Sequence, residues 1–177
     1  ILEAEASSRK KSAERLMAPR NQAAVQALSH AREAYRTVTD KHRKSGLAAS
    51  AQYRLGEVAY NEKDWANAIE EFRQVQKSHP KTYIVPESWM GIVNSQLALE
   101  QFAQAESNLF LLGETHPNYL RVPSVLYAQG IVSLHKADYA AAERAMKGVK
   151  SAEAQFYLGK TYLLSKRPFL AATAFEQ

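Results

Sequence analysis

The sequence repeats itself at an interval of 37 residues, so that residues 51–80 are followed by a similar stretch at residues 88–117. Equivalent positions hold aromatic residues, then alanines, then large apolar residues: Trp65, Phe102 and Tyr139; Ala68, Ala105 and Ala142; Phe72, Leu109 and Met146. The alanines and the large apolar residues are four positions apart, which is helical spacing. A fixed period of this length predicts a solenoid of stacked helical hairpins, in which each unit buries its apolar face against its neighbours.

Each unit contains two predicted helices, named here helix A and helix B. In the first complete unit, helix A is expected at about residues 49–60 and helix B at about residues 65–77. Asp64 is a candidate N-cap of helix B, and Asp138 recurs in the same place two periods later. The pair His79-Pro80 ends helix B because proline cannot continue the hydrogen-bond ladder. The linker from residue 79 to residue 86 recurs at residues 116–123, and its second proline suits the first turn of the next helix A.

The two ends of the chain fit the period less well. Residues 19–44 are expected to form a helix B, whose helix A would come from the degenerate residues 3–18. Near the other end, Gly130 and Gly159 are only 29 residues apart, so the third unit needs a shorter helix B or a tighter turn. We therefore predict basic leading helices at residues 1–46, as a degenerate first repeat, and a repeat domain at 47–177. Its units lie at about 47–83, 84–120, 121–150 and 151–177, with the last incomplete and the chain read as a segment of a longer protein.

Composition and motifs argue against a catalytic or metal-binding role. The chain has no cysteine, which excludes disulfides, thiolate zinc sites and cysteine nucleophiles. No run of about 18 apolar residues is present, as a membrane-spanning helix would require. Glycine-rich phosphate loops, G-x-S-x-G and H-E-x-x-H are also missing. His42, His79 and His116 recur with the period, but stacked repeats would hold them too far apart to share one ion. We predict no enzymatic activity, no cofactor and no metal.

The formal net charge of +5 is concentrated at the start of the chain. Residues 1–50 hold ten Lys or Arg against five Asp or Glu, while residues 51–177 hold thirteen of each. Such an excess can contact an acidic partner, anionic lipid or nucleic acid, the last being the less expected. The alternative is an ordinary solvated helix face, because the basic residues are interleaved with acidic ones. The basic residues concerned are Arg9, Lys10, Lys11, Arg15 and Arg20.

The repeat resembles the tetratricopeptide-repeat family. The residues that carry the resemblance are Leu55, Gly56, Trp65, Ala68, Phe72 and Pro80. It implies an all-α, right-handed superhelical solenoid of antiparallel helix-turn-helix units. The chain departs from the family in its longer period and in Val93, which stands where the pattern has glycine. The lengthened His-Pro linkers are similar to those of bacterial envelope members, which favours a periplasmic or outer-membrane-associated protein over a cytoplasmic one.

In the family, helix A of each unit lines a concave groove, and the matching positions here form a stripe of large side chains. The candidate groove residues are Tyr53, Glu57, Tyr60, Met90, Asn94, Tyr127, Ile131, Phe156 and Lys160. The alternative is that the stripe packs in the core. One subset of the family grips a terminal carboxylate with a cation and an Asn. The positions here hold Tyr53, Glu57, Met90 and Asn94, with no cation, so we expect no such clamp.

These observations predict a noncatalytic scaffold that binds a segment of a protein partner in its groove, plausibly within a bacterial envelope assembly. Such a scaffold has no small-molecule substrate. Two alternatives remain open. The basic leading segment could instead bind anionic lipid or nucleic acid, or the repeats could associate with each other. Self-association is suggested by Phe169 and Phe175, which a terminal helix without a following unit would leave exposed.

Overall fold

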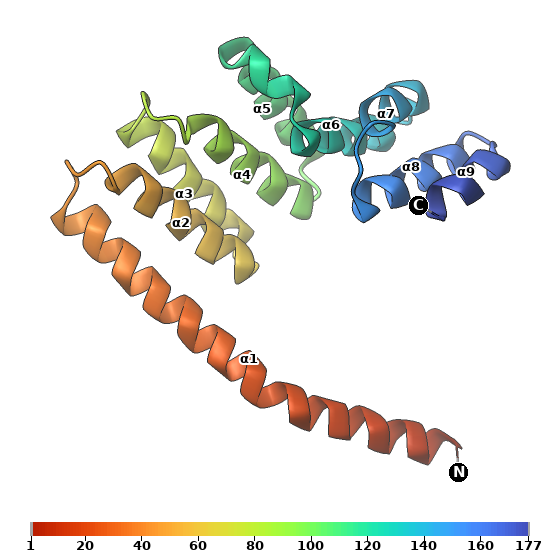
Figure 1. Cartoon of the computed structure of the whole chain (residues 1–177), viewed down its shortest axis with the longest axis horizontal. Helices are drawn as coiled ribbons and strands as arrows, with labels where there is room; N and C mark the ends of the chain where they lie inside the picture. Colours follow the sequence, from red (N-terminus) through yellow and green to blue (C-terminus); the bar gives the residue numbers. More distant parts are fainter. Residues whose placement is uncertain (1, 177) are drawn as a thin grey trace.

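The period of the sequence corresponds to a row of antiparallel helical hairpins (Figure 1). The computed structural model describes residues 2–176, with side chains described from residue 22 onward. Within that range the elements are α1 (Leu2–Lys41), α2 (Ala48–Asn61), α3 (Trp65–Ser78), α4 (Val85–Ala98), α5 (Phe102–Thr115), the 3₁₀ helix η1 (Pro117–Arg121), α6 (Pro123–His135), α7 (Tyr139–Met146), α8 (Ala152–Leu164) and α9 (Pro168–Phe175). The helical pairs α2/α3, α4/α5, α6/α7 and α8/α9 each pack as a hairpin. The predicted helical-repeat solenoid is therefore confirmed.

The leading segment differs from the prediction. Residues 3–18 and 19–41 lie in one continuous helix, α1, instead of a helix A followed by a helix B. No glycine interrupts the helix, since the first glycine of the chain is Gly46, and α1 continues through Pro19, where the boundary was expected. The basic residues Arg9 to Arg20, on which the charge argument depends, lie outside the residues with described side chains.

The second half of α1 nevertheless behaves as the expected helix B. It packs against α2, and its half-buried apolar residues follow helical spacing. They are Leu28, Ala31, Tyr35 and Val38. Ala31 and Tyr35 precede the buried Ala68 and Phe72 by one period, so α1 covers the first face of the solenoid in the way that α3 covers the second.

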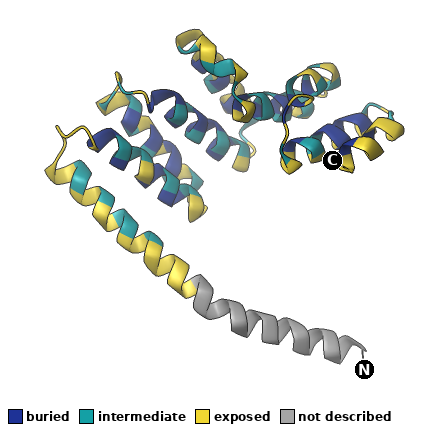
Figure 2. Cartoon of the chain, in the orientation of Figure 1, coloured by how far each residue is buried: buried dark blue, intermediate teal, exposed yellow. Residues whose placement is uncertain are grey.

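The buried residues lie where neighbouring helices face each other (Figure 2). There, small residues on one helix receive large residues from another. Phe72 of α3 is 2% exposed and lies between Gly56 of α2 and Gly91 of α4. A Cβ atom added at either glycine would be 2.5 Å from a carbon of the Phe72 ring. One aromatic ring thus sets how closely three successive helices approach.

The same arrangement explains why Val93 can replace glycine in the second unit. Position 93 is equivalent to position 56, and the residue equivalent to Phe72 is Leu109. Val93 and Leu109 belong to one buried cluster between α4, α5 and α6. Because leucine is smaller than phenylalanine and lacks its ring, it leaves part of the room that the valine side chain occupies.

The turns inside the hairpins share a feature that the sequence analysis did not identify. Lys63, Glu100, Ala137 and Lys166 follow the four A helices at equivalent positions, and all have φ between 57° and 63°. This is the left-handed conformation that commonly ends a helix and is easiest for glycine. The predicted N-caps are confirmed, since Asp64 accepts from Asn67 N at 3.3 Å and Asp138 from Ala141 N at 3.0 Å.

The third unit is the short one, as the contracted spacing predicts. Its helix B, α7, has eight residues against fourteen in α3 and α5. Glu143 of α7 ties this unit to the next, because its carboxylate accepts from Arg167 Nη1 at 2.8 Å and from the Tyr162 hydroxyl at 3.2 Å. The hydrogen bond from Arg167 is the main cause that lowers the pKa of Glu143.

Candidate protein-binding groove

Two adjoining pockets run across the A helices, and together they define the groove. The first pocket lies over α2 and α4 and reaches η1 and the start of α6; it has a volume of about 320 Å³. The second lies over α4, α6 and α8 and has a volume of about 500 Å³. Tyr60 and Asn94 line both pockets, which makes the groove continuous. The direct packing of α4 on α2 and α6, and of α6 on α8, places these helices on one side of the solenoid.

The predicted groove residues divide between the two pockets. Those that line the first pocket are Tyr53, Glu57, Tyr60, Met90 and Asn94. Those that line the second are Tyr60, Asn94, Tyr127, Ile131 and Lys160. Phe156 lines neither pocket.

Phe156 is turned toward the last helix instead of the groove. Its ring is 55% exposed and its centroid lies 5.9 Å from that of Phe175 in α9. The neighbouring Tyr157 takes the groove position, where its ring meets Tyr127 edge-on at 6.0 Å. The contact with Phe175 accounts for the difference, because successive residues of a helix point in directions about 100° apart.

Some groove residues also belong to the core, as the alternative of a stripe packed in the core expects. Met90 is 5% exposed and is a member of the buried cluster between α4, α5 and α6. Tyr53 is half-buried, and its ring lies 5.3 Å from that of Phe72. Met90 therefore forms part of the floor of the first pocket, while Tyr53 forms a wall that also supports the hairpin.

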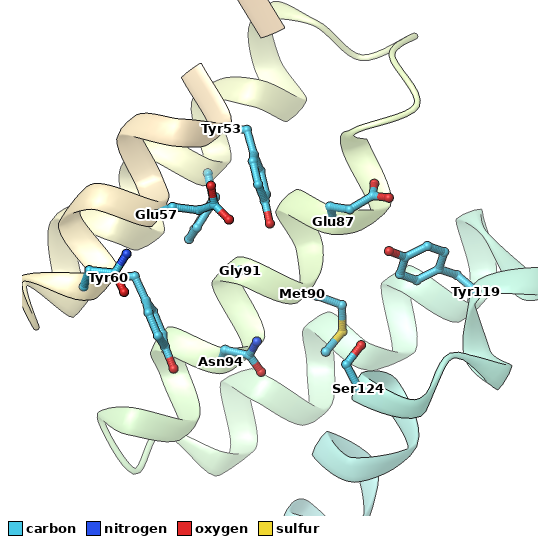
Figure 3. Close-up of a pocket in the computed structure, with 11 residues that line it drawn as sticks. Tyr53, Glu57, Tyr60, Glu87, Met90, Gly91, Asn94, Tyr119 and Ser124 are labelled. Atoms are coloured by element: carbon cyan, nitrogen blue, oxygen red, sulfur yellow. The ribbon is translucent and has the colours of Figure 1, made fainter. Parts of the chain in front are cut away.

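The first pocket combines phenol groups with carboxylates (Figure 3). Tyr53 and Tyr119 face each other across the pocket, and the Tyr119 hydroxyl points toward the Glu87 carboxylate. Burial, followed by the charges of Glu57 and Glu87, raises the pKa of Tyr53 to about 12. Burial and the adjacent Glu87 raise the pKa of Tyr119 to about 12 as well. The pocket is therefore a partly desolvated site with a negative potential.

The second pocket is larger and has more aliphatic residues in its lining. Its wall includes Phe102, whose ring stacks on His135 at a centroid distance of 3.8 Å. At the opposite side, Lys160 Nζ lies 5.8 Å from the centroid of Tyr157. Leu134 and Leu164 complete the apolar lining. A large apolar side chain with an acidic neighbour would find complementary contacts here.

Several lining residues were missed by the sequence analysis. Glu87 could have been found, because it lies one helical turn before Met90 on the same helix face. Tyr157 required knowledge of the direction of α8. Tyr119 gave no sequence signal, since it reaches the pocket only because η1 folds back against α5 and α6.

Among the residues whose side chains are described, no three His, Asp or Glu side chains are grouped as a metal ion would require. No helix within the described range has the length and apolar character needed to cross a membrane.

Comparison with known proteins agrees with the architecture. The family model "Tetratricopeptide repeat" matches residues 19–81, which run from the middle of α1 to the end of α3. No curated protein matches the sequence.

Two solved structures share the fold over most of the chain. The structure of MamA from residue 41 to its end, from Desulfovibrio magneticus RS-1, has a TM-score of 0.64 and 17% identity, covering 92% of this chain and 90% of the other. A MamA RS-1 ArsTM double mutant has a TM-score of 0.63 and 18% identity, with 82% of each chain covered. The resemblance to the tetratricopeptide-repeat family is thus confirmed over residues 19–81, and the same helical-hairpin fold continues to α9.

Proposed function

We propose that this protein is a noncatalytic interaction scaffold whose groove binds an extended segment of a protein partner. The observation that supports it is the pair of joined pockets, which follows the A helices and is lined by large side chains from α2, α4, α6 and α8. Aromatic residues at such a surface contribute large contact areas at a small cost in conformational entropy. A role in a bacterial envelope assembly is part of the proposal and rests on the lengthened His-Pro linkers.

Affinity capture with matched variants tests the groove. Asn94 lies at the junction of the two pockets and is half-buried, so Asn94→Arg would block the groove without removing core contacts. Ser107 is exposed on α5, and Ser107→Arg adds the same side chain away from both pockets. We expect partners retained by the wild type and by Ser107→Arg to be lost by Asn94→Arg at unchanged helicity. Retention of the same partners by Asn94→Arg would place binding elsewhere.

A second candidate function is self-association through the last helix. Phe169 of α9 is 89% exposed, and Leu170 and Phe175 beside it are 46% and 47% exposed. Burying an almost fully exposed side chain such as Phe169 against another copy would be favourable by about 1.5–3 kcal/mol. Static light scattering should then show a mass that rises with concentration and that Phe169→Ser lowers; a strict monomer would exclude this function.

The basic leading segment is the third proposal, for binding to anionic lipid or nucleic acid. It is favoured by the run of four exposed residues from Lys41, the last residue of α1, to Lys44. Binding of this kind releases counterions from the lipid or nucleic acid, so added salt weakens it steeply. Binding in an aromatic groove responds much less, so a salt titration of any captured partner separates the two functions.

A further inference from the structure

The first pocket carries a negative charge that the chain itself leaves largely unbalanced. Its lining contains Glu57 and Glu87 but no Lys, Arg or His among the described residues. Glu87 forms no ion pair within the described part of the chain, and its Oε2 atom is buried without a hydrogen-bond partner there. A carboxylate in this state is stabilised by any cation that can reach the pocket.

Glu57 does have a partner, yet that pair is weak. Its carboxylate accepts from Arg54, whose side chain is 55% exposed and lines an adjoining hollow beside Tyr53 and Glu87, not the first pocket itself. Exposed ion pairs of this kind contribute little because water competes for both groups. An incoming cation can therefore use the second oxygen of Glu57 or take the place of Arg54.

Three phenol rings complete the environment of a cation. Tyr53, Tyr60 and Tyr119 line the same pocket as the two carboxylates (Figure 3). The face of an aromatic ring attracts a guanidinium or ammonium group, more strongly where water is partly excluded. The raised pKa of Tyr53 and of Tyr119 agrees with a pocket that disfavours further negative charge.

The second pocket differs from the first in its lining residues, so the two ends of the groove would bind different side chains. Apolar and aromatic side chains dominate its lining, and its two oppositely charged residues, Glu100 and Lys160, leave it without the excess of carboxylates found in the first pocket. Neighbouring helices lie about 8–10 Å apart, and an extended chain in the polyproline II conformation advances about 3.1 Å per residue and returns to the same face every three residues. Residues that occupy the two pockets would therefore be separated by about three positions in the bound segment.

We propose that the first pocket binds the arginine or lysine side chain of a partner's extended segment, with a large apolar residue about three positions away in the second pocket. The proposal rests on the groove function proposed above and specifies the chemistry of its ligand. It is opposite in charge to a groove that holds a carboxylate, so acidic segments are rejected at the first pocket.

Peptide selection tests this without knowledge of the natural partner. Random peptides displayed on phage are selected on the wild-type chain, and enriched peptides are then measured by fluorescence anisotropy. We expect enrichment of peptides with a basic residue about three positions from a large apolar one. Replacing that residue by glutamine should weaken binding about tenfold, as expected for a cation held by aromatic and charged groups.

Matched Glu→Gln variants assign the effect to the pocket. In Glu87→Gln the difference between the basic peptide and its glutamine version should largely disappear. In Glu106→Gln, which changes an exposed carboxylate of α5, the tenfold difference should persist. Peptides that lose binding with Asn94→Arg but bind equally well with glutamine in place of the basic residue would overturn this inference and leave the groove function standing. Absence of any peptide sensitive to Asn94→Arg would contradict both.

Discussion

Phe72 shows how a single residue determines the spacing of three helices. Its ring fills the space left by the missing side chains of Gly56 and Gly91. The pairing of a glycine with a large side chain on the facing helix recurs twice: Gly130 faces Met146, and Gly159 faces Phe175. Val93 stands where this pattern has glycine, and the residue that faces it is Leu109, which is smaller than phenylalanine. The distance between neighbouring helices therefore depends on pairs of facing residues and not on single positions.

Gly56→Ala should destabilise the protein by about 1–3 kcal/mol, because the added Cβ overlaps the Phe72 ring and forces the hairpin apart. Gly148→Ala is the matched control, since an added Cβ there has no neighbour within 4 Å. We expect the control to change the free energy of unfolding by less than about 0.5 kcal/mol. Urea denaturation followed by circular dichroism measures both. Equal losses in the two variants would show that the glycine contacts do not set the packing.

Tyr53 gives the groove a measurable pH response. Its pKa is raised to about 12 from 10.0, so deprotonation is harder in the folded chain than in the unfolded chain. This contribution to stability is fully present below pH 10 and is lost as the pH rises from 10 toward 12. Ultraviolet titration should show tyrosines that ionise late, and Tyr53→Phe should remove part of this late phase. Ionisation of every tyrosine near pH 10 would contradict the partly desolvated pocket.

At the scale of elements, the four hairpin turns depend on a left-handed residue that is never glycine. Ala137 has φ 58°, a conformation that costs an alanine up to about 1 kcal/mol relative to glycine. Ala137→Gly should therefore increase the free energy of unfolding by up to that amount. Ala172→Gly, at an exposed position inside α9, should instead decrease it by about 1 kcal/mol. Thermal or urea unfolding of both variants distinguishes the two signs, and destabilisation by both would refute the role of this turn residue.

The N-caps of the B helices allow a reciprocal test. Asp64 and Asp138 cap α3 and α7, while the equivalent Gln101 of α5 makes no side-chain cap. Asp138→Ala should destabilise the protein by about 1 kcal/mol, and Gln101→Asp should stabilise it by about 0.5–1 kcal/mol. Urea unfolding of the two variants measures the changes. No gain from Gln101→Asp would mean that the start of α5 is held by other contacts.

The elements were predictable from the sequence to different degrees. The second helix of the first complete unit, α3, lies where its local signals placed it, since Asp64 precedes it and Pro80 follows it. The leading helix was harder, because the period alone cannot tell a degenerate hairpin from one long helix. The left-handed turns were also missed, since lysine, glutamate and alanine carry no sign of that conformation.

At the scale of the whole molecule, the sequence repeat predicts where the groove lies but not all of the residues that line it. Residues such as Tyr127 and Ile131 follow from the period, because equivalent positions of successive A helices lie side by side. Tyr119 does not, since it belongs to η1 and reaches the first pocket through the fold of a linker. Phe156 occupies a groove position in the repeat, but its side chain packs against Phe175 instead, so the period alone does not predict its direction.

The central claim is that partners bind in the groove, and site-specific photocrosslinking tests it most directly. A benzoylphenylalanine in place of Tyr127 would lie in the second pocket, and one in place of the 65% exposed Phe110 would lie on α5, outside both groove pockets. After illumination of the probe in cells or in an extract, we expect a covalent adduct with a partner from position 127 and none from position 110. Adducts from position 110 alone would show that partners bind outside the groove and would contradict the account.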